Sequence, residues 1–284
     1  MIPLLLLVAV LQGQPVRIQV GTVNVLAQPR QLPLAIGLAE QANRTFDWPG
    51  LGRRIPGPFR LVVVGDSLQL REVSRGLAPA WGAGVMLPGI RTIIVRTDLD
   101  SPEQTFRHEL AHLALHDAVP TRVPLWFDEG YASWAAGEWD RLEILRLNLA
   151  VAGGTAPDLR ELDGMLRGSA GTAGIAYALA VSAVLELARR NPTGTIGPLL
   201  TKLQAGEGFE PSVLATTGLT LGRFELEWQR DLRHRYNLLT WLLAGGFWAR
   251  TKPGSPRTRK APKTIGINWD RIILASFVNE AEMR

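Results

Sequence analysis

Three of the four histidines in this chain lie close together, at His108, His112 and His116. The first two belong to the pattern His-Glu-Leu-Ala-His, residues 108–112. Residues four apart share one face of an α-helix, so two imidazoles at this spacing can bind a single Zn²⁺. Glu109, between them, can reach a water molecule at the metal and take its proton. The pattern therefore indicates hydrolysis assisted by a metal ion.

The residues around the pattern predict the helix that it needs. Ser101 suits the N-cap, Pro102 the first helical position, and Gln104 the last position of a capping box. We expect the helix to end near Asp117. Its apolar residues form one stripe, at a different angle from the histidines: Phe106, Leu110 and Leu113. One face then packs on the protein core while the other faces a cleft.

A third metal ligand must come from outside the five-residue pattern. His116 lies about 12 Å along the helix axis from His108, too far to share an ion whose bonds are about 2.1 Å long. We expect a supporting or surface position for His116. Glu129 is the stronger candidate, 17 positions after His112. It falls on a second predicted helix, which a proline-flanked loop would allow to fold back antiparallel to the first.

The rest of the chain predicts an α+β fold with a small mixed sheet, two antiparallel helices carrying the site, and a helical C-terminal half. We expect the second site helix to run from near Leu125 to Gly153–Gly154. Hydrophobic patterns predict the other elements: strands at 16–25 and 59–67, a helix from Leu34, a hairpin at 84–98 with Pro88–Gly89 in its turn, and helices at 174–191, 193–206 and 222–236.

The segment PLWFDEGYASW, residues 124–134, strengthens this interpretation. With HELAH before it, at this spacing, it resembles the glutamate zincin (gluzincin) peptidases, and among them the peptidase-MA-like members. The resemblance covers about residues 84–190. It implies a zincin-like catalytic domain in which His108, His112 and Glu129 ligate Zn²⁺ and Glu109 is the general base.

The same resemblance suggests further site residues. Tyr177 matches a position where such families place a tyrosine facing the cleft, so it is either an oxyanion donor or a core residue. Gly84 and Val85 would lie on an edge strand that pairs with an extended peptide substrate. Ser133 departs from thermolysin-like enzymes, which carry there an aspartate that orients a ligand histidine. The residues that orient the ligands must therefore lie elsewhere in this chain.

Composition narrows the chemistry. The chain has no cysteine, which excludes disulfides, thiol nucleophiles and iron–sulfur clusters, so only His, Asp or Glu can hold a metal. The net charge is +5, but residues 250–263 carry six basic residues and no acidic one, which leaves the rest near −1. The chain outside residues 250–263 therefore lacks the excess of basic residues that is typical of nucleic-acid-binding proteins. We expect no nucleic-acid partner.

Both ends carry targeting or membrane signals. Residues 1–14 have the length and apolarity of a signal peptide, or alternatively of a buried first strand, and we favour export to the cell envelope or beyond. Residues 237–284 join an apolar segment to the basic tail. The apolar part spans roughly 20 Å as a helix, short of the ~30 Å of a bilayer core. It either contacts a membrane surface or packs on the protein, and the tail is either bound there or disordered. Between the ends we expect a catalytic subdomain, 15–153, and a helical subdomain, 154–236.

The sequence thus predicts a zinc-dependent peptidase acting on peptide or protein substrates. The alternative is a non-catalytic binding or assembly module of the cell envelope that keeps the zincin fold. A deformylase-like hydrolase is excluded, because that family needs a cysteine ligand and this chain has none.

Overall fold

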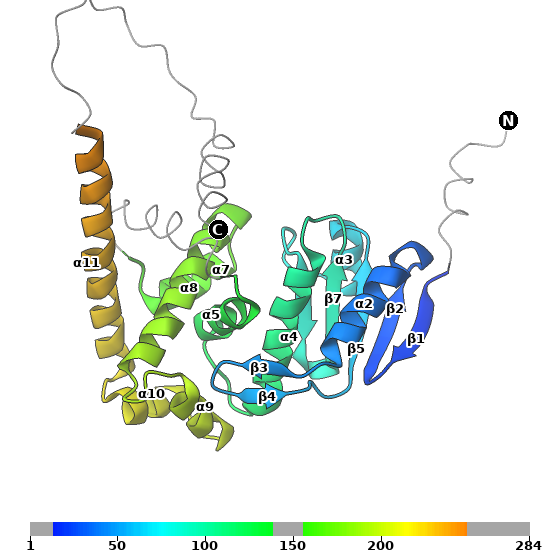
Figure 1. Ribbon diagram of the computed structural model, residues 1–284, viewed down its shortest axis with the longest axis horizontal. Helices are drawn as coiled ribbons and strands as arrows, with labels where there is room; N and C mark the ends of the chain where they lie inside the picture. The colour runs from blue at the N-terminus through cyan, green and yellow to red at the C-terminus, as the bar shows by residue number, and fades with distance from the viewer. Residues whose placement is uncertain (1–13, 139–155, 249–284) are drawn as a thin grey trace, which may run out of the picture. The chain divides into compact units, whose positions relative to one another are not determined.

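The computed structural model describes residues 14–138 and 156–248, with side chains up to His234. Within them the chain has the expected α+β fold (Figure 1). The strands are β1 (Val16–Val20), β2 (Val23–Ala27), β3 (Phe46–Trp48), β4 (Gly52–Arg54), β5 (Phe59–Val64), β6 (Gly84–Leu87) and β7 (Thr92–Arg96). The helices are α2 (Leu32–Ala42), α3 (Ser67–Val73), α4 (Pro102–Ala118), α5 (Leu125–Ala136), α7 (Leu159–Leu166), α8 (Ala170–Arg190), α9 (Gly197–Gln204), α10 (Phe209–Thr217) and α11 (Leu221–Trp248).

A five-stranded mixed sheet organises the first half of the fold, in the order β1-β2-β5-β7-β6. β2, β5 and β7 are parallel, whereas the outer strands β1 and β6 run antiparallel to their neighbours. β5 is rich in valine and buried on both faces, as expected for a central strand covered by helices on each side. β6 is an edge strand. β3 and β4 pair separately.

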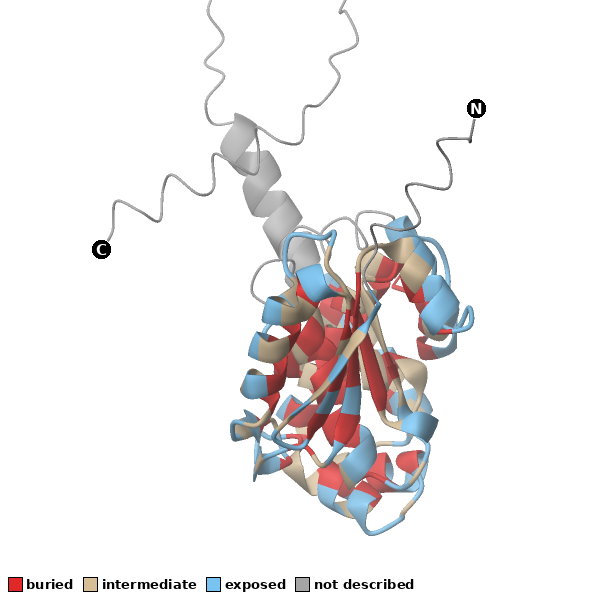
Figure 2. Ribbon diagram, turned by 90° about the vertical axis from the view of Figure 1, so that its right-hand side faces the viewer, coloured by how far each residue is buried: buried red, intermediate tan, exposed pale blue. Residues whose placement is uncertain are grey.

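The two faces of the sheet pack against different helices (Figure 2). Leu61 and Val63 of β5 belong to the main core, which includes residues of α2 and α4. Val62 and Val64 face the other way and pack with Leu70 of α3. On the main face α4 lies against β6 and β7. The helix that carries the histidines is thereby placed beside the edge of the sheet.

α4 and α5 pack antiparallel, as predicted. Gln104, near the start of α4, donates a hydrogen bond to the backbone carbonyl of Ala136 at the end of α5. At the other end of the pair, His116 contacts Asp128 in the first turn of α5. α4 begins at Pro102, as expected, but Ser101 makes no side-chain cap hydrogen bond. Gln104 therefore ties the two helices together instead of completing a capping box.

The helical half is built around α8, which packs on α5 and α7. Of the helices that the structure describes, α8 alone has the length and hydropathy of a membrane span, and 56% of that stretch is buried inside the protein. Its apolar character is explained by this packing. Phe224, Trp228 and Leu232 on α11 are also buried, and the indole of Trp228 donates a hydrogen bond to Ser182 of α8.

Two predicted elements were wrong in detail. The second site helix ends at Ala136, because Gly137 adopts φ 77° and closes it with a left-handed C-cap. The strand expected at 16–25 is a hairpin, since the chain turns at Gly21. The strand predicted within 59–67 ends at Val64, and the turn residues after it include Asp66, which caps α3 by accepting a hydrogen bond from the Gln69 amide.

Other predictions fall wholly or partly outside the described residues. These are the signal peptide at 1–14, the continuation of the second helix from 139 to 153 with the subdomain boundary after it, and the basic tail at 250–263. The described residues up to Leu242 form one compact unit, and those from Leu243 belong to another. Residues 237–248 continue α11, where a separate apolar segment was expected.

Candidate metal centre

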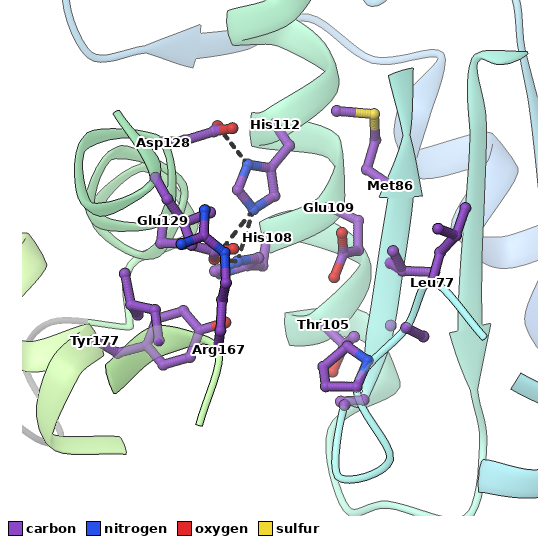
Figure 3. A pocket seen from close by; sticks show the side chains of 18 of the residues that line it. Leu77, Met86, Thr105, His108, Glu109, His112, Asp128, Glu129, Arg167 and Tyr177 are labelled. Carbon is purple, nitrogen blue, oxygen red and sulfur yellow. Dashed lines mark hydrogen bonds and ion pairs between the residues drawn. The ribbon is translucent and has the colours of Figure 1, made fainter. Parts of the chain in front are cut away.

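Two histidines of α4 and one glutamate of α5 converge in the cleft beside the sheet (Figure 3). The Nε2 atoms of His108 and His112 lie 3.1 Å apart. Glu129 Oε2 lies 3.3 Å from the first nitrogen and 3.4 Å from the second. Tetrahedral bonds of about 2.1 Å would place ligand atoms about 3.4 Å apart. Two imidazole nitrogens and a carboxylate oxygen at these separations fit Zn²⁺.

A carboxylate orients the ring of His112. Its Nδ1 lies 2.7 Å from Asp128 Oδ1. Because a carboxylate can only accept a hydrogen bond, Nδ1 carries a proton, and Nε2 is the nitrogen that would bind a metal ion. Asp128 Oδ2 in turn lies 2.8 Å from His116 Nε2. His116 thus supports the site through Asp128, in the supporting position that the sequence predicted.

A second carboxylate orients the ring of His108. Glu138 Oε2 lies 3.1 Å from His108 Nδ1, and Ser133 Oγ lies 3.5 Å from the same nitrogen. Glu138 follows the left-handed Gly137, which ends α5. This explains the serine at position 133: the carboxylate that faces His108 comes from the end of the helix.

Charge in the site is strongly one-sided. Burial lowers the pKa of both imidazoles, but the carboxylate of Glu138 and then that of Glu129 outweigh it for His108 and raise its pKa to about 10. For His112 the carboxylates of Asp128 and Glu129 do the same. Burial opposes ionisation of Glu129, yet the two imidazoles hold its pKa at about 2. The raised pKa values of the two imidazoles reflect the carboxylates around them, and the lowered pKa of Glu129 reflects the two imidazoles beside it.

Glu109 points into the same cleft, toward β6. Burial raises its pKa, and the opposing effect of the imidazoles of His108 and His112 does not cancel this increase. The adjacent residue on the sheet is Gly84, and a Cβ there would lie 2.8 Å from Thr105 Cγ2 and 3.0 Å from Glu109 Oε1. Only a glycine lets α4 approach the strand this closely. The edge strand and the candidate base are therefore in direct contact.

Tyr177 reaches the site from α8. Its ring centre lies 5.9 Å from that of His108, edge to face. Burial and then the charges of Glu129 and Glu109 raise the pKa of its phenol, which stays protonated. α8 can come this close because of Gly130, where a Cβ would lie 2.5 Å from the backbone oxygen of Ala180. The glycine after Glu129 thus brings the tyrosine-bearing helix against α5.

All seven residues that the sequence singled out line one cavity of about 730 Å³: Gly84, Val85, His108, Glu109, His112, Glu129 and Tyr177. The sequence missed Asp128 and Glu138, which hold the imidazoles. Asp128 directly precedes Glu129, so the sequence showed that it would lie near the metal ligands. The sequence did not show that its side chain would face His112. The sequence analysis also missed Trp81, whose indole donates a 2.9 Å hydrogen bond across the cleft to the carbonyl of Gly168.

Comparison with known proteins agrees with this geometry. The family model of the Peptidase MA superfamily matches residues 50–234. The match spans more than half of the 284 residues and includes the edge strand, both site helices and α8. No curated protein matches the chain. With its zincin-like α+β fold and its metallopeptidase-like domain, the chain belongs to the Peptidase MA superfamily.

Proposed function

We propose that this protein is a zinc metallopeptidase of the gluzincin type. The observation that carries the proposal is the convergence of His108, His112 and Glu129 within 3.1–3.4 Å of one another, beside the buried carboxylate of Glu109. His108, His112 and Glu129 are assigned as metal ligands. Two nitrogens and one oxygen suit zinc, and three protein ligands leave a coordination position open.

Bound zinc would supply a Lewis acid and a water of lowered pKa. Glu109 takes a proton and returns it to the leaving amine, a role that its raised pKa favours by bringing the carboxyl closer to neutral pH. A purely structural zinc site would have no use for this buried carboxylate. Asp128 and Glu138 hold the imidazoles in place throughout, and Tyr177 offers its phenol O–H to a developing negative charge.

The substrate is assigned to the edge strand. β6 pairs with β7 on one side and is the last strand in the sheet. Gly84 and Val85 line the cavity together with Glu109. An extended peptide added to this edge would be held by backbone hydrogen bonds, which depend little on side chains. The scissile bond would then lie between the strand and the metal ligands.

Replacement of the base tests the proposal. Glu109→Gln should keep about one zinc per chain and lower peptide hydrolysis by about 10²- to 10⁴-fold. Zinc content is measured by atomic absorption, and hydrolysis with a fluorogenic peptide library, with and without chelator. The matched control is Glu103→Gln, an exposed glutamate in the first turn of the same helix, which should keep both.

Two results would contradict the proposal. Unchanged turnover in Glu109→Gln would mean that another group acts as the base. A zinc-loaded wild type that cleaves no peptide in the library would indicate a binding or assembly module instead of an enzyme.

A further inference from the structure

Arg167 stands out among the residues that line the cleft. It follows α7 and is exposed. Of the described residues lining the cavity, it is the single lysine or arginine, whereas Glu109, Asp128, Glu129 and Glu138 are all acidic. Figure 3 shows its side chain running past Tyr177, with the guanidinium toward the Glu129 side of the site. A guanidinium group therefore faces the space where substrate would bind.

The guanidinium of Arg167 is not engaged in an ion pair within the described part of the chain. Its one hydrogen bond there is a long one, 3.4 Å from Nη1 to the backbone oxygen of Asp163. The Asp163 carboxylate instead accepts a 2.7 Å hydrogen bond from the Trp126 amide. Asp128 is occupied by two histidines. The carboxylates of Asp163 and Asp128 thus bind other groups, and the N–H donors of the Arg167 guanidinium can bind a ligand.

The backbone next to Arg167 is anchored. The carbonyl of Gly168 accepts the hydrogen bond from the Trp81 indole, and the Trp81 ring packs edge to face on Tyr177 with ring centres 6.4 Å apart. These contacts join the wall formed by the sheet half to the wall formed by the helical half. Arg167 is therefore presented from a fixed point at the mouth of the cleft.

The cleft also continues past Arg167. A second hollow, lined by Arg122 and Asp163, shares five residues with the first: Pro88, His116, Leu125, Asp128 and Arg167. Arg122 is exposed and makes no ion pair among the described residues. A peptide leaving the metal centre in this direction would pass one guanidinium group and then approach another.

We propose that Arg167 binds a carboxylate of the substrate. On the proposed function, on which this inference rests, the enzyme prefers peptides that carry a carboxylate near the scissile bond. A guanidinium matches a carboxylate with two parallel hydrogen bonds, which are charge-assisted and directional. The carboxylate is supplied either by an Asp or Glu side chain or by the C-terminus of the peptide. Elsewhere in the acidic cleft, such a group would be repelled.

The test uses peptides that differ in one group. One pair has a Glu or a Gln at each position flanking the cleavage site, and a second pair ends in a free acid or an amide. The kcat/KM of each is measured with wild-type protein, Arg167→Gln and Arg167→Lys. We expect wild type to prefer the acid of one pair by about tenfold or more. The preference should fall to near one in Arg167→Gln and recover in part in Arg167→Lys. The pair that shows the preference identifies the source of the carboxylate.

Binding is measured in parallel, so that the inference does not depend on turnover. Zinc-loaded Glu109→Gln, with and without Arg167→Gln, is titrated with the same labelled peptides. Arg160→Gln is the control, an exposed arginine of α7 outside the cavity. Acid discrimination in binding, together with no hydrolysis by the zinc-loaded wild type, would leave this inference standing while the proposed function fails. Hydrolysis with no acid preference in either pair, or an equal preference in wild type and Arg167→Gln, would overturn it.

Discussion

Two clusters of charged side chains stand out among the described residues, and they are built differently. One, here called the ion-pair cluster, joins α8 to α11 through Glu186, Arg189, Arg190, Arg223, Glu227 and Asp231. The other, here called the site cluster, joins α4 to α5 through His108, Glu109, His112, His116, Asp128, Glu129 and Glu138. Both place several carboxylates in a poorly solvated region.

The difference lies in what meets the carboxylates. In the ion-pair cluster each carboxylate contacts at least one guanidinium group, so the set is complete without a ligand. In the site cluster, the ion-pair contacts of Asp128, Glu129 and Glu138 among the described residues are to imidazoles and not to guanidinium groups, and Glu109 has none. Two imidazole nitrogens lie 3.1 Å apart. A buried charge that lacks a partner is costly. Carboxylates that are all paired with guanidinium groups can stabilise the fold by themselves. Carboxylates that lack such partners would be stabilised by a bound cation.

The largest effect is expected from breaking the site cluster at a ligand. His112→Ala should lower the zinc content from about one per chain to near zero and reduce hydrolysis by on the order of 10³-fold or more, because several kcal/mol of metal-assisted stabilisation are lost. Zinc analysis and a peptide assay measure both.

His116→Ala is the matched control for this variant, since it removes a histidine of the same helix that contacts only Asp128. It should keep its zinc. Loss of zinc from both His116→Ala and His112→Ala would instead assign the ion to the neighbouring group of His112, His116 and Asp128.

Breaking the ion-pair cluster should lower the stability of the protein and leave its zinc content unchanged. Glu186→Ala leaves Arg189 and Arg190 short of a partner and should lower the free energy of unfolding by about 3 kcal/mol. Urea denaturation measures it, and zinc content should not change. Glu210→Ala, at an exposed position on α10, should stay within about 0.5 kcal/mol of wild type. Zinc loss in Glu186→Ala would refute the separation of the two clusters.

Gly84→Ala tests the contact between the edge strand and the base. The added methyl group would meet Thr105 and Glu109, so the glutamate must move while the ligands stay in place. We expect a loss of about 10²-fold in kcat, with full zinc content. Gly37→Ala is the control, because a Cβ there meets nothing within 4 Å. Wild-type activity in Gly84→Ala would show that the position of Glu109 does not limit the reaction.

The smallest of these effects concerns the residues behind the ligands. Glu138→Gln removes the charge that faces His108 Nδ1 and should weaken zinc affinity by about 10- to 100-fold. Competition with a chromophoric chelator measures the dissociation constant. Glu72→Gln, at an exposed site on α3, serves as control. An unchanged affinity would assign the orienting role to Ser133 alone.

Much of the site could be predicted because its chemistry is encoded by local spacing. His108 and His112 share a helical face whatever surrounds them, and Pro102 marks where that helix starts. Glu129 followed from the distance between two helices and the prolines in the loop. These features depend on a few neighbouring residues, which a single sequence displays.

The remaining features depend on long-range contacts. Asp128 could have pointed to either side of α5, and packing against α8 decides which. Glu138 reaches His108 only because Gly137 takes a left-handed conformation, and the sequence pattern favoured a longer helix. Arg167 comes from a short helix that was not predicted at all. When a residue reaches the site from a distant part of the chain, the hydrophobic periodicity of the sequence does not indicate that it will lie there.

Gly130 has a consequence for how the protein can move. Where α5 crosses α8, two main chains touch with no side chain between them that could change rotamer and absorb a displacement. The wall holding Glu129 and Tyr177 must then behave as a single rigid body. We therefore expect any adjustment to a bulky polypeptide to occur on the opposite side of the cleft, at the edge strand β6.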